Sequence, residues 1–309
     1  MSKPPFALFR WRSDQHWEGY LFLLPGLIGL LLFSLLPVLF SLGISLFEWD
    51  LLTPPVFVGI KNFRDLFTQD LIFSEVAANT VFFCVTIVPL QLSLSLLLAL
   101  ALTQRLRGAA VFRVIYYMPV VTTIVAAAVI FQWIFDRNYG LFSGLIWNLG
   151  DWLNWPIQPP DWFNSSFWAR WAVVILTLWK NSGFTTVILM AGLQGIPRVL
   201  YEAAAIDGAG RWRAFRHITL PMLSPTLFFL SVILIIGAFQ LFGESFVMTG
   251  GGPGYATMTV VQYIYQSAFS YFRMGKGAAL SWVLFAAIFA LTLAQLRLQR
   301  KWVHYESGV

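Results

Sequence analysis

The sequence YEAAAIDGAGRWRAFRHITLP, residues 201–221, lies between two long apolar segments. It contains Glu202, Asp207 and Arg211, although only 11% of the 309 residues in the chain are charged. A segment of this polarity does not lie in hydrocarbon, because charged side chains are costly there. We therefore expect residues 201–221 to lie on a membrane surface and to separate two membrane-spanning helices.

The same segment predicts two short helices with a glycine between them. Pro197 suits the first turn of a helix, and the sequence RVLYEAAAIDGA that follows is rich in Ala, Leu and Glu, which favour helix. Gly208 can end this helix because glycine readily adopts the left-handed conformation. A second short helix is expected over about residues 211–218, ending before Pro221.

The composition identifies the class of protein. Hydrophobic residues make up 58% of the chain and its mean hydropathy is +0.72, which excludes an ordinary soluble enzyme and indicates an integral membrane protein. The net charge of +6 is explained by Lys and Arg in cytoplasmic loops, so no nucleic-acid partner is expected. The single cysteine, Cys84, lies in an apolar run and offers no disulfide framework.

Six segments are apolar and long enough to cross a bilayer as helices, since each crossing needs about 20 residues. They are residues 20–47, 76–102, 114–135, 167–192, 223–247 and 276–296. The first is too long to be the apolar part of a signal peptide, so we expect it to remain as a helix. The chain is therefore predicted to be an all-α membrane protein with one domain over residues 1–309: an N-terminal segment 1–19, the spans within 20–296, and a tail 297–309.

The distribution of basic residues predicts the orientation. With six spans, both termini and the even-numbered loops share one side of the membrane. That side carries Lys3, Arg10, Arg12, Arg105, Arg107, Arg113, Arg198, Arg211, Arg213, Arg216, Arg297, Arg300 and Lys301, whereas the other side carries Lys61, Arg64, Arg137 and Arg273. Because Lys and Arg concentrate in cytoplasmic loops, both termini and residues 201–221 are expected in the cytoplasm.

The predicted outer loop 136–166 is rich in tryptophan and has two interpretations. Trp147, Trp152, Trp155 and Trp162 would suit an aromatic belt at the membrane interface, where amphipathic rings are favoured. The same residues would also suit a docking surface for an external partner. The sequence leaves both interpretations open.

The chain lacks the motifs of an energy-converting enzyme. None of its five lysines is followed by Ser or Thr, so it has no phosphate-binding Gly-Lys-Ser/Thr loop. His16, His217 and His304 are too far apart to suggest a metal site. We therefore expect no catalytic residue, metal or cofactor on this chain, and we expect another chain to supply the energy for any work.

Residues 201–221 have two physical interpretations at the membrane surface. An amphipathic helix lying on the bilayer would place its Arg side chains on lipid phosphates. However, Ala203, Ala204 and Ala205 make a small face that anchors poorly in lipid and lets another protein approach closely. The residues themselves therefore favour a protein-docking element.

The sequence EAAAIDGAGRWRAFRHITLP resembles the cytoplasmic EAA loop of permease subunits in bacterial binding-protein-dependent ABC importers. The matching residues are Glu202, Ala203, Ala204, Asp207, Gly208, Ala209, Phe215, Ile218, Leu220 and Pro221. The resemblance implies a type I importer permease fold, in which this loop forms a coupling helix seated in a cleft of a cytoplasmic ATPase. The ATPase-coupling residues would then be Glu202, Ala203, Ala204, Asp207, Gly208, Ala209, Arg211 and Phe215.

Further segments resemble the carbohydrate-uptake branch of this family, with its maltose-type F and glycerol-phosphate-type A permeases. These segments are residues 112–140, 191–197 and 247–269, the last with a Gly-Gly-Gly-Pro turn at 250–253. The resemblance implies a place in the bacterial inner membrane and several partners. These are a second homologous permease subunit, two copies of an ATPase that binds ATP and Mg²⁺, an extracytoplasmic solute-binding protein, and a sugar or polyol substrate.

Polar and aromatic residues within the spans mark a candidate solute pathway, since such residues usually face a bundle interior or a water-filled path. They are Thr123 in the third span, Thr177, Lys180, Asn181 and Phe184 in the fourth, and Phe239, Gln240 and Glu244 in the fifth. Gln240 and Glu244, four residues apart, are expected on one helix face. Aromatic rings and amides suit a sugar, and the resemblance places these segments in the sugar-contacting regions.

The roles of some residues stay open. Lys180 and Glu244 form either an ion pair that stabilises the bundle or part of the pocket. Asn79 and Thr80 in the second span match a dipeptide of the family but have no assigned role.

The sequence thus predicts a permease subunit, not an enzyme, that moves a sugar, polyol or related small solute inward while a separate ATPase hydrolyses ATP. An anionic solute such as glycerol 3-phosphate is an alternative, although it would require more cations than Lys180. A secondary carrier that works without an ATPase is a further alternative. The absence of a catalytic cluster disfavours a membrane enzyme.

Overall fold

The computed structural model describes residues 16–103, 109–156 and 158–303. Several residues used above lie outside these ranges, namely Lys3, Arg10, Arg12, Arg105, Arg107 and His304. The described part of the chain is almost entirely helical. Its one hairpin pairs β1 (Phe47–Glu48) with β2 (Val56–Phe57) in antiparallel register, with Phe47 opposite Phe57.

Among the described residues, five helices are long and apolar enough to cross a membrane, and a bent pair of helices gives a sixth span. The first span combines α1 (His16–Leu30), a π turn (Leu31–Leu35) and α2 (Leu36–Ile44). The others are α4 (Leu71–Leu102), the pair α5 (Ala109–Val121) and α6 (Ile124–Ile134), α8 (Ser166–Gln194), α11 (Leu220–Phe239) and α14 (Met274–Leu298). The predicted helical class and the six spans are confirmed, with corrections to two of the spans.

The helices α4 and α8 pack side by side at the centre of the bundle, and α5 and α11 pack against them. Small residues allow this close approach. A Cβ atom at Gly183 on α8 would lie 2.7 Å from the carbonyl oxygen of Tyr116 on α5. A Cβ atom at Gly192 would lie 2.8 Å from the side chain of Leu223 on α11. The helix that carries Lys180 is therefore held tightly on both sides.

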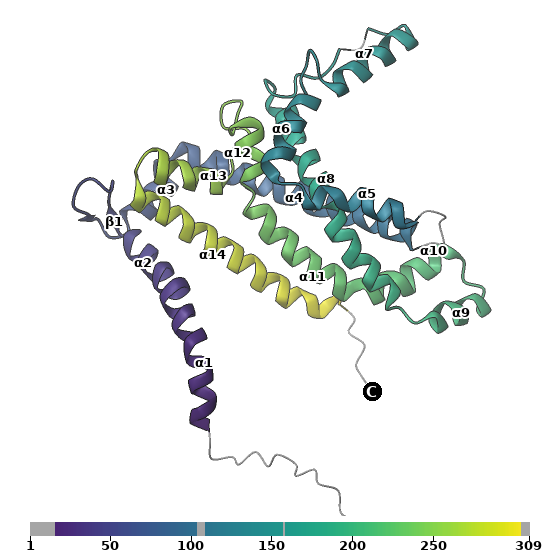
Figure 1. The fold of residues 1–309 in the computed structure, drawn as a ribbon, viewed down its shortest axis with the longest axis horizontal. Coiled ribbons are helices and arrows are strands. Elements are labelled where there is room, and N and C mark those ends of the chain that lie inside the picture. Colours follow the sequence, from purple (N-terminus) through teal and green to yellow (C-terminus); the bar gives the residue numbers. More distant parts are fainter. Residues whose placement is uncertain (1–15, 104–108, 157, 304–309) are drawn as a thin grey trace, which may run out of the picture.

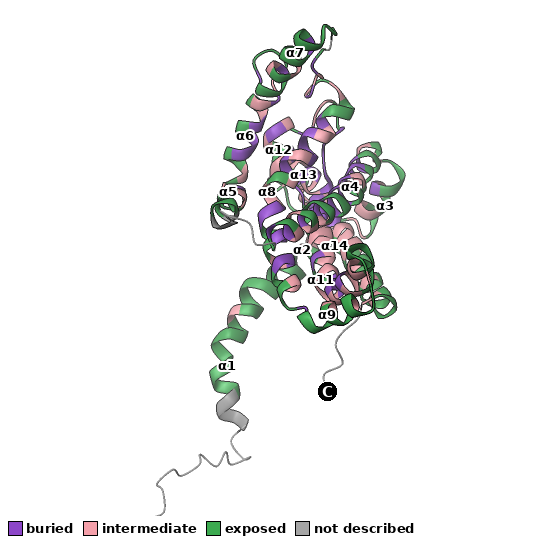
Figure 2. Ribbon diagram, turned by 90° about the vertical axis from the view of Figure 1, so that its right-hand side faces the viewer, coloured by how far each residue is buried: buried purple, intermediate pink, exposed green. Residues whose placement is uncertain are grey.

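Shorter elements lie at the ends of the bundle. The hairpin, α3 (Lys61–Thr68) and α13 (Val260–Tyr265), with its π turn Gln266–Ser270, lie at one end, whereas α9 (Arg198–Ile206) lies at the other (Figure 1). A 3-10 turn (Gln299–Lys301) follows α14. The helices α1 and α7 (Leu141–Leu153) extend away from the bundle and are exposed along much of their length (Figure 1, Figure 2).

The third span is broken, which the sequence analysis did not predict. Its two helices, α5 and α6, meet at an angle of 110°. Pro119 within α5 lacks an N–H donor, and the Thr123 hydroxyl caps α6 by accepting a hydrogen bond from the Ala126 nitrogen at 3.4 Å. The prediction of one continuous helix over residues 114–135 is therefore wrong.

The predicted fifth span, residues 223–247, is interrupted as well, because the membrane-spanning helix ends at Phe239. Three residues separate α11 from the next helix, α12 (Gly243–Thr249). The carbonyl of Leu241 in this break accepts a hydrogen bond from the Thr259 hydroxyl at 2.6 Å, so it needs no helical partner. Gln240 and Glu244 lie on either side of the break. The prediction that they share one helix face is wrong.

The second short helix predicted within residues 201–221 is not separate. The helix α10 (Arg211–Ala214) continues through a π turn (Phe215–Thr219) into α11, so Arg211–Phe239 form one long helix. Pro221 lacks a backbone donor, and the wider π turn before it lets the helix continue past the proline ring. The predicted helix end before Pro221 is therefore wrong.

The tryptophans of the outer loop do not share one environment. Trp147, Trp152 and Trp155 are exposed on α7 and just after it. Trp162 is buried against Phe135, with ring centres 4.3 Å apart. Trp162 is therefore a core residue, and the prediction that it belongs to a belt or a docking surface is wrong.

Candidate functional site

The helix α9 forms the first part of the predicted docking segment. It starts after Pro197, whose extended backbone places this residue before the first helical turn rather than in it. No residue on α9 is buried, and Val199 and Ile206 are 64% and 87% exposed. Apolar side chains so exposed at one end of the bundle present a surface that another protein can cover.

Gly208 ends α9 in the predicted left-handed conformation, with a φ of +74°. The Ala209 nitrogen donates to the Ala204 carbonyl at 2.8 Å, and the Gly208 nitrogen donates to the Ala205 carbonyl at 3.1 Å. These two hydrogen bonds form a Schellman motif, which satisfies the last carbonyls of the helix. The turn directs the chain toward the long helix that begins at Arg211.

The predicted coupling residues differ in accessibility. Glu202, Ala203, Asp207, Gly208 and Arg211 are exposed, whereas Ala204, Ala209 and Phe215 are half-buried. The Phe215 ring stacks on the exposed Trp212, with ring centres 5.5 Å apart. None of the ion pairs in the described part of the chain involves Glu202, so its carboxylate is accessible to a cation on a partner.

The start of α6, at the break in the third span, lies against the start of α12. Gly243 at the start of α12 faces Ile124 at the start of α6, and a Cβ atom on this glycine would lie 3.0 Å from Ile124 Cγ2. Gln132 on α6 donates to the carbonyls of Val247 and Met248 at 3.0 and 2.9 Å. Irregular backbone at membrane depth is tolerated where protein covers it or where it lines a water-filled path. The Gln132 contacts cover part of the backbone of α12.

Lys180 closes the break in the third span. Its Nζ donates to the Thr122 carbonyl oxygen at 2.9 Å, beside the C-terminal end of α5, where a cation is favourable. Of the two roles that the sequence left open, the ion pair is not formed, because the ion pairs of the described residues include neither Lys180 nor Glu244. Lys180 therefore caps the C-terminal end of α5.

The other pathway residues divide into two groups. Thr123, Phe184 and Gln240 are exposed, and Asn181 and Glu244 are half-buried. Thr177 is buried, and its hydroxyl donates to the Val173 carbonyl of its own helix at 2.8 Å. Phe239 is buried in an apolar cluster with Cys84. Thr123 and Lys180 thus lie at the break between α5 and α6, whereas Thr177 and Phe239 belong to the core.

Asn79 and Thr80 hold the loop after α12 against the bundle. Asn79 Nδ2 donates to two carbonyl oxygens of loop 250–259, at 2.6 and 3.1 Å. Thr80 Oγ1 accepts a hydrogen bond from the Val260 nitrogen at 3.0 Å. The dipeptide that had no assigned role in the sequence analysis therefore fixes this loop to α4.

Arg170 completes the same network from α8. Its Nη2 donates to Asn79 Oδ1 and its Nε to the Ala256 carbonyl, both at 2.9 Å. Its guanidinium also lies over the Phe82 ring, 5.5 Å from the ring centre. Arg170 was not among the residues predicted from the sequence, although a single arginine inside an apolar span is itself a signal of a buried polar partner.

Glycine allows the loop after α12 to turn back onto the bundle. Gly250, Gly251 and Gly254 have φ values of 64°, 92° and 61°, a region that residues with a Cβ atom rarely adopt. A Cβ atom at Gly251 would lie 2.8 Å from Gln262 Nε2. The Gly-Gly-Gly-Pro sequence singled out above thus forms a compact turn.

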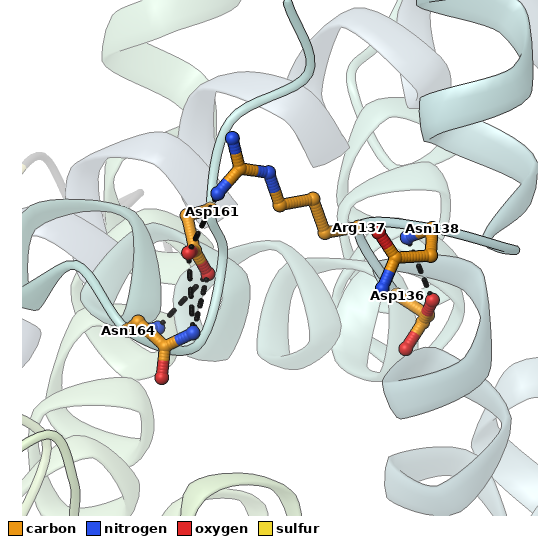
Figure 3. A network of polar contacts seen from close by, with 5 residues as sticks. All are labelled: Asp136, Arg137, Asn138, Asp161 and Asn164. Carbon is orange, nitrogen blue, oxygen red and sulfur yellow. Dashed lines mark hydrogen bonds and ion pairs between the residues drawn. The ribbon is translucent and has the colours of Figure 1, made fainter.

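The two ends of the outer loop are tied together beside a cavity of about 660 Å³. Arg137 and Asp161 form an ion pair at 3.1 Å, and Asn164 donates to the same carboxylate from its backbone and side chain (Figure 3). The hydrogen bonds from Asn164, with the charge of Arg137, hold the pKa of Asp161 below its usual value. These contacts fix the base from which α7 extends.

The polar contacts of Asn79, Arg170 and Lys180 hold the loop after α12 and the end of α5 in place. Within residues 16–103, 109–156 and 158–303, no group of three or more His, Cys, Asp or Glu side chains is placed to hold a metal ion. The main features are the exposed helix α9, the long helix Arg211–Phe239, and the polar contact of Lys180 at the break between α5 and α6.

Comparison with known proteins gives a family match over most of the chain. Residues 91–304 match the family described as binding-protein-dependent transport system inner membrane component. The chain is 35% identical to the probable ABC transporter permease protein YesP of Bacillus subtilis, over 94% of this chain and 92% of the relative. It is 36% identical to the trehalose/maltose transport system permease protein MalF of Thermococcus litoralis, over 91% and 93% of the two chains. It is 37% identical to the sulfoquinovosyl glycerol transport system permease protein SmoG of Agrobacterium fabrum, over 91% and 89%.

The fold is also similar to that of a solved structure. A chain of a bacterial alginate ABC transporter, in complex with an alginate pentasaccharide-bound periplasmic protein, aligns with a TM-score of 0.79 at 22% identity. The alignment covers 95% of this chain and 96% of the other. The expected importer permease fold is thereby confirmed.

Proposed function

The chain belongs to the family of binding-protein-dependent transport system inner membrane components, and we propose that it is the permease subunit of an ATP-driven importer of a sugar, polyol or related small solute. It is an inner-membrane protein with six spans. One observation carries the proposal. The exposed helix α9 is joined through the Gly208 turn to a helix that runs unbroken from Arg211 to Phe239.

The long helix gives a displacement of α9 a direct route to the pathway. Its 29 residues extend for about 43 Å at about 1.5 Å per residue. Its far end, Phe239, immediately precedes the break before α12. Movement of this end would change the spacing between α6 and α12 and so open or close a path for the solute. The chain supplies the path and the coupling, whereas ATP hydrolysis takes place in a partner.

The proposed assembly contains three further kinds of protein. Two copies of a cytoplasmic ATPase bind ATP and Mg²⁺ and receive α9, where the exposed Glu202 can pair with an arginine of the ATPase. A second homologous permease subunit forms the other half of the path. An extracytoplasmic binding protein delivers the solute, in accordance with the description of the family. The docking side of α9 is accordingly proposed to be cytoplasmic.

A neutral solute fits the pathway better than an anion. Lys180 is the one cation among the candidate pathway residues, and its ammonium group already donates to the Thr122 carbonyl. An anion such as glycerol 3-phosphate would require several charge-assisted hydrogen bonds. Maltose and trehalose are the first sugars to test, because a relative is named for their transport.

The test is to assemble the complex and measure ATP hydrolysis. We expect this chain to co-purify with an ATPase and a second permease. We also expect the ATPase rate to rise when the binding protein is supplied with a neutral sugar such as maltose or trehalose, and not with glycerol 3-phosphate. Accumulation of a solute by vesicles that contain this chain alone would instead indicate a secondary carrier and overturn the proposal.

A further inference from the structure

The helix α9 is weakly attached to the rest of the molecule. None of its residues is buried, and it is bounded by Pro197 at one end and by the Gly208 turn at the other. The residue before Pro197, Ile196, is buried and fixes the entry of the chain into this segment. Because α9 buries no residue, the core of the bundle does not fix the angle between α9 and the long helix.

One side-chain hydrogen bond joins α9 directly to the long helix. The hydroxyl groups of Tyr201 and Thr219 lie 2.9 Å apart and form a hydrogen bond across 18 positions of the chain. Within the part of the chain that the structure describes, α9 makes no other side-chain hydrogen bond to another element. Thr219 is only 5% exposed, so water does not readily replace Tyr201 as its partner.

The positions of Tyr201 and Thr219 suggest what their hydrogen bond does. Thr219 is the last residue of the π turn within the long helix, and such turns are frequent at functional sites. Tyr201 is half-buried, whereas Glu202 and Ile206 of the same helix are exposed. The side of α9 that carries Tyr201 is thus bonded to the long helix, and the exposed residues remain accessible to a partner.

We propose that Tyr201 is a positioning residue that locks α9 to the long helix through Thr219, so that both move as one body. This inference rests on the proposed function, because it assumes that a partner displaces α9. With the hydrogen bond in place, a displacement of α9 reaches the pathway end of the long helix at Phe239. Without it, α9 pivots about Pro197 and Gly208, and the displacement is lost before it reaches the spans.

The test removes single hydroxyl groups in the complete complex, reconstituted in vesicles with the binding protein and labelled maltose or trehalose. Tyr201→Phe and Thr219→Val each delete one partner, and Thr219→Ser keeps the hydroxyl. Tyr139→Phe is the matched control, because Tyr139 is 84% exposed and lies between α6 and α7, and Figure 1 shows both helices away from α9. Two quantities are measured, namely co-purification of the ATPase and the amount of sugar imported per ATP hydrolysed.

We expect Tyr201→Phe and Thr219→Val to bind the ATPase normally but to import about fivefold less sugar per ATP. The size of the effect corresponds to the loss of one hydrogen bond. The double variant should be no worse than either single variant, because both remove the same interaction. Thr219→Ser and Tyr139→Phe should behave as the wild type. The rate of amide hydrogen exchange in α9 should also rise in Tyr201→Phe. This rate reports directly on how firmly α9 is attached to the long helix.

The outcomes separate this inference from the proposed function. If the wild-type complex neither binds an ATPase nor imports a sugar, the proposed function fails. If the wild-type complex works and Tyr201→Phe keeps both the wild-type import per ATP and the wild-type exchange of α9, the positioning role of Tyr201 is wrong and the proposed function stands. Additive losses in the double variant would equally exclude a shared hydrogen bond.

Discussion

Lys180 and its acceptor, the Thr122 carbonyl, are 58 positions apart in the chain. The sequence identified Lys180 as a polar residue in an apolar span, but it did not reveal this partner. The Thr122 carbonyl has no helical donor because the third span breaks immediately after it. The role of Lys180 therefore depends on a break that hydropathy alone does not show. Arg170 was missed for a similar reason, since its acceptors lie on α4 and in a later loop.

Replacing Lys180 should destabilise the break that it caps. In Lys180→Met the Thr122 carbonyl loses a charged donor, and we expect the free energy of unfolding to fall by about 2 kcal/mol. Lys180→Arg should retain most of the stability because the charge and a donor remain. Thermal unfolding of the purified protein in detergent measures both variants. Equal unfolding temperatures for Lys180→Met and the wild type would contradict the capping role.

Replacing Asn79 should release the loop after α12. Asn79→Ala removes two hydrogen bonds to loop carbonyls and leaves Arg170 without one of its acceptors, so we expect a loss of about 2–4 kcal/mol in stability. Asn148→Ala on the exposed surface of α7 is the matched control and should have little effect. Limited proteolysis within loop 250–259 and thermal unfolding report the change. Resistance equal to that of the control would show that the loop is held by other contacts.

At the scale of elements, the apolar spans were predictable because a bilayer sets their length and composition. Their interruptions were not, because the few polar residues at them, Thr122, Thr123 and Gln240, lie within otherwise apolar sequence. Local signals were present nonetheless. Pro119 and the capping Thr123 lie near the first break, but their effect depends on the Lys180 contact from another helix. Pro221 misled the prediction in the other direction, since a π turn lets the helix continue past it.

The left-handed turn at the end of α9 predicts different effects for two neighbouring glycines. Gly208 has a φ of +74° and Gly210 a φ of −69°, and a Cβ atom at either position would meet no other atom within 4 Å. Gly208→Ala therefore adds only backbone strain, of about 1–2 kcal/mol. We expect it to reduce sugar import per ATP, whereas Gly210→Ala should not. Similar import by both variants would show that the turn has no part in coupling.

Asp70 links three elements at the opposite end of the bundle and predicts a pH dependence. Its carboxylate lies 2.7 Å from Lys276 Nζ on α14 and accepts a hydrogen bond from the Tyr263 hydroxyl on α13 at 2.7 Å. Burial opposes ionisation, but these two partners outweigh it and hold the pKa of Asp70 below its usual value. A lowered pKa in the folded state means that the ionised carboxylate stabilises the fold above its ordinary pKa. This stabilisation is lost as the pH falls through the folded-state pKa.

Removing Lys276 should shift this loss to higher pH. In Lys276→Met the burial of Asp70 is opposed only by the hydrogen bonds from Tyr263 and the Phe73 nitrogen, so its pKa rises and the stabilisation disappears at a less acidic pH. Unfolding temperatures measured between about pH 3 and pH 7 test this shift. Lys61→Met is the control, because its ion pair with Glu48 is exposed and contributes little. Identical pH profiles for Lys276→Met and Lys61→Met would contradict the account.

At the scale of the whole molecule, composition fixed the class and one short segment indicated the family. The exposed residues of 201–221, the proposed docking surface, were recognisable because they are contiguous in the sequence. The route from that surface to the pathway was not, because it depends on α10 and α11 forming a single helix and on the hydroxyl bond between Tyr201 and Thr219. Neither the continuous helix nor the hydrogen bond produces a periodic pattern of apolar residues, so neither could be predicted from the sequence.

The central claim is that α9 and the long helix move as one body when the ATPase binds ATP. Spin labels at Ile206 on α9, Ile233 on α11 and Leu97 on α4, all exposed, allow distances to be measured in the complete complex after replacement of Cys84. We predict that ATP leaves the distance between residues 206 and 233 unchanged and alters the distance between residues 233 and 97. A change between 206 and 233, with 233 and 97 fixed, would contradict the claim.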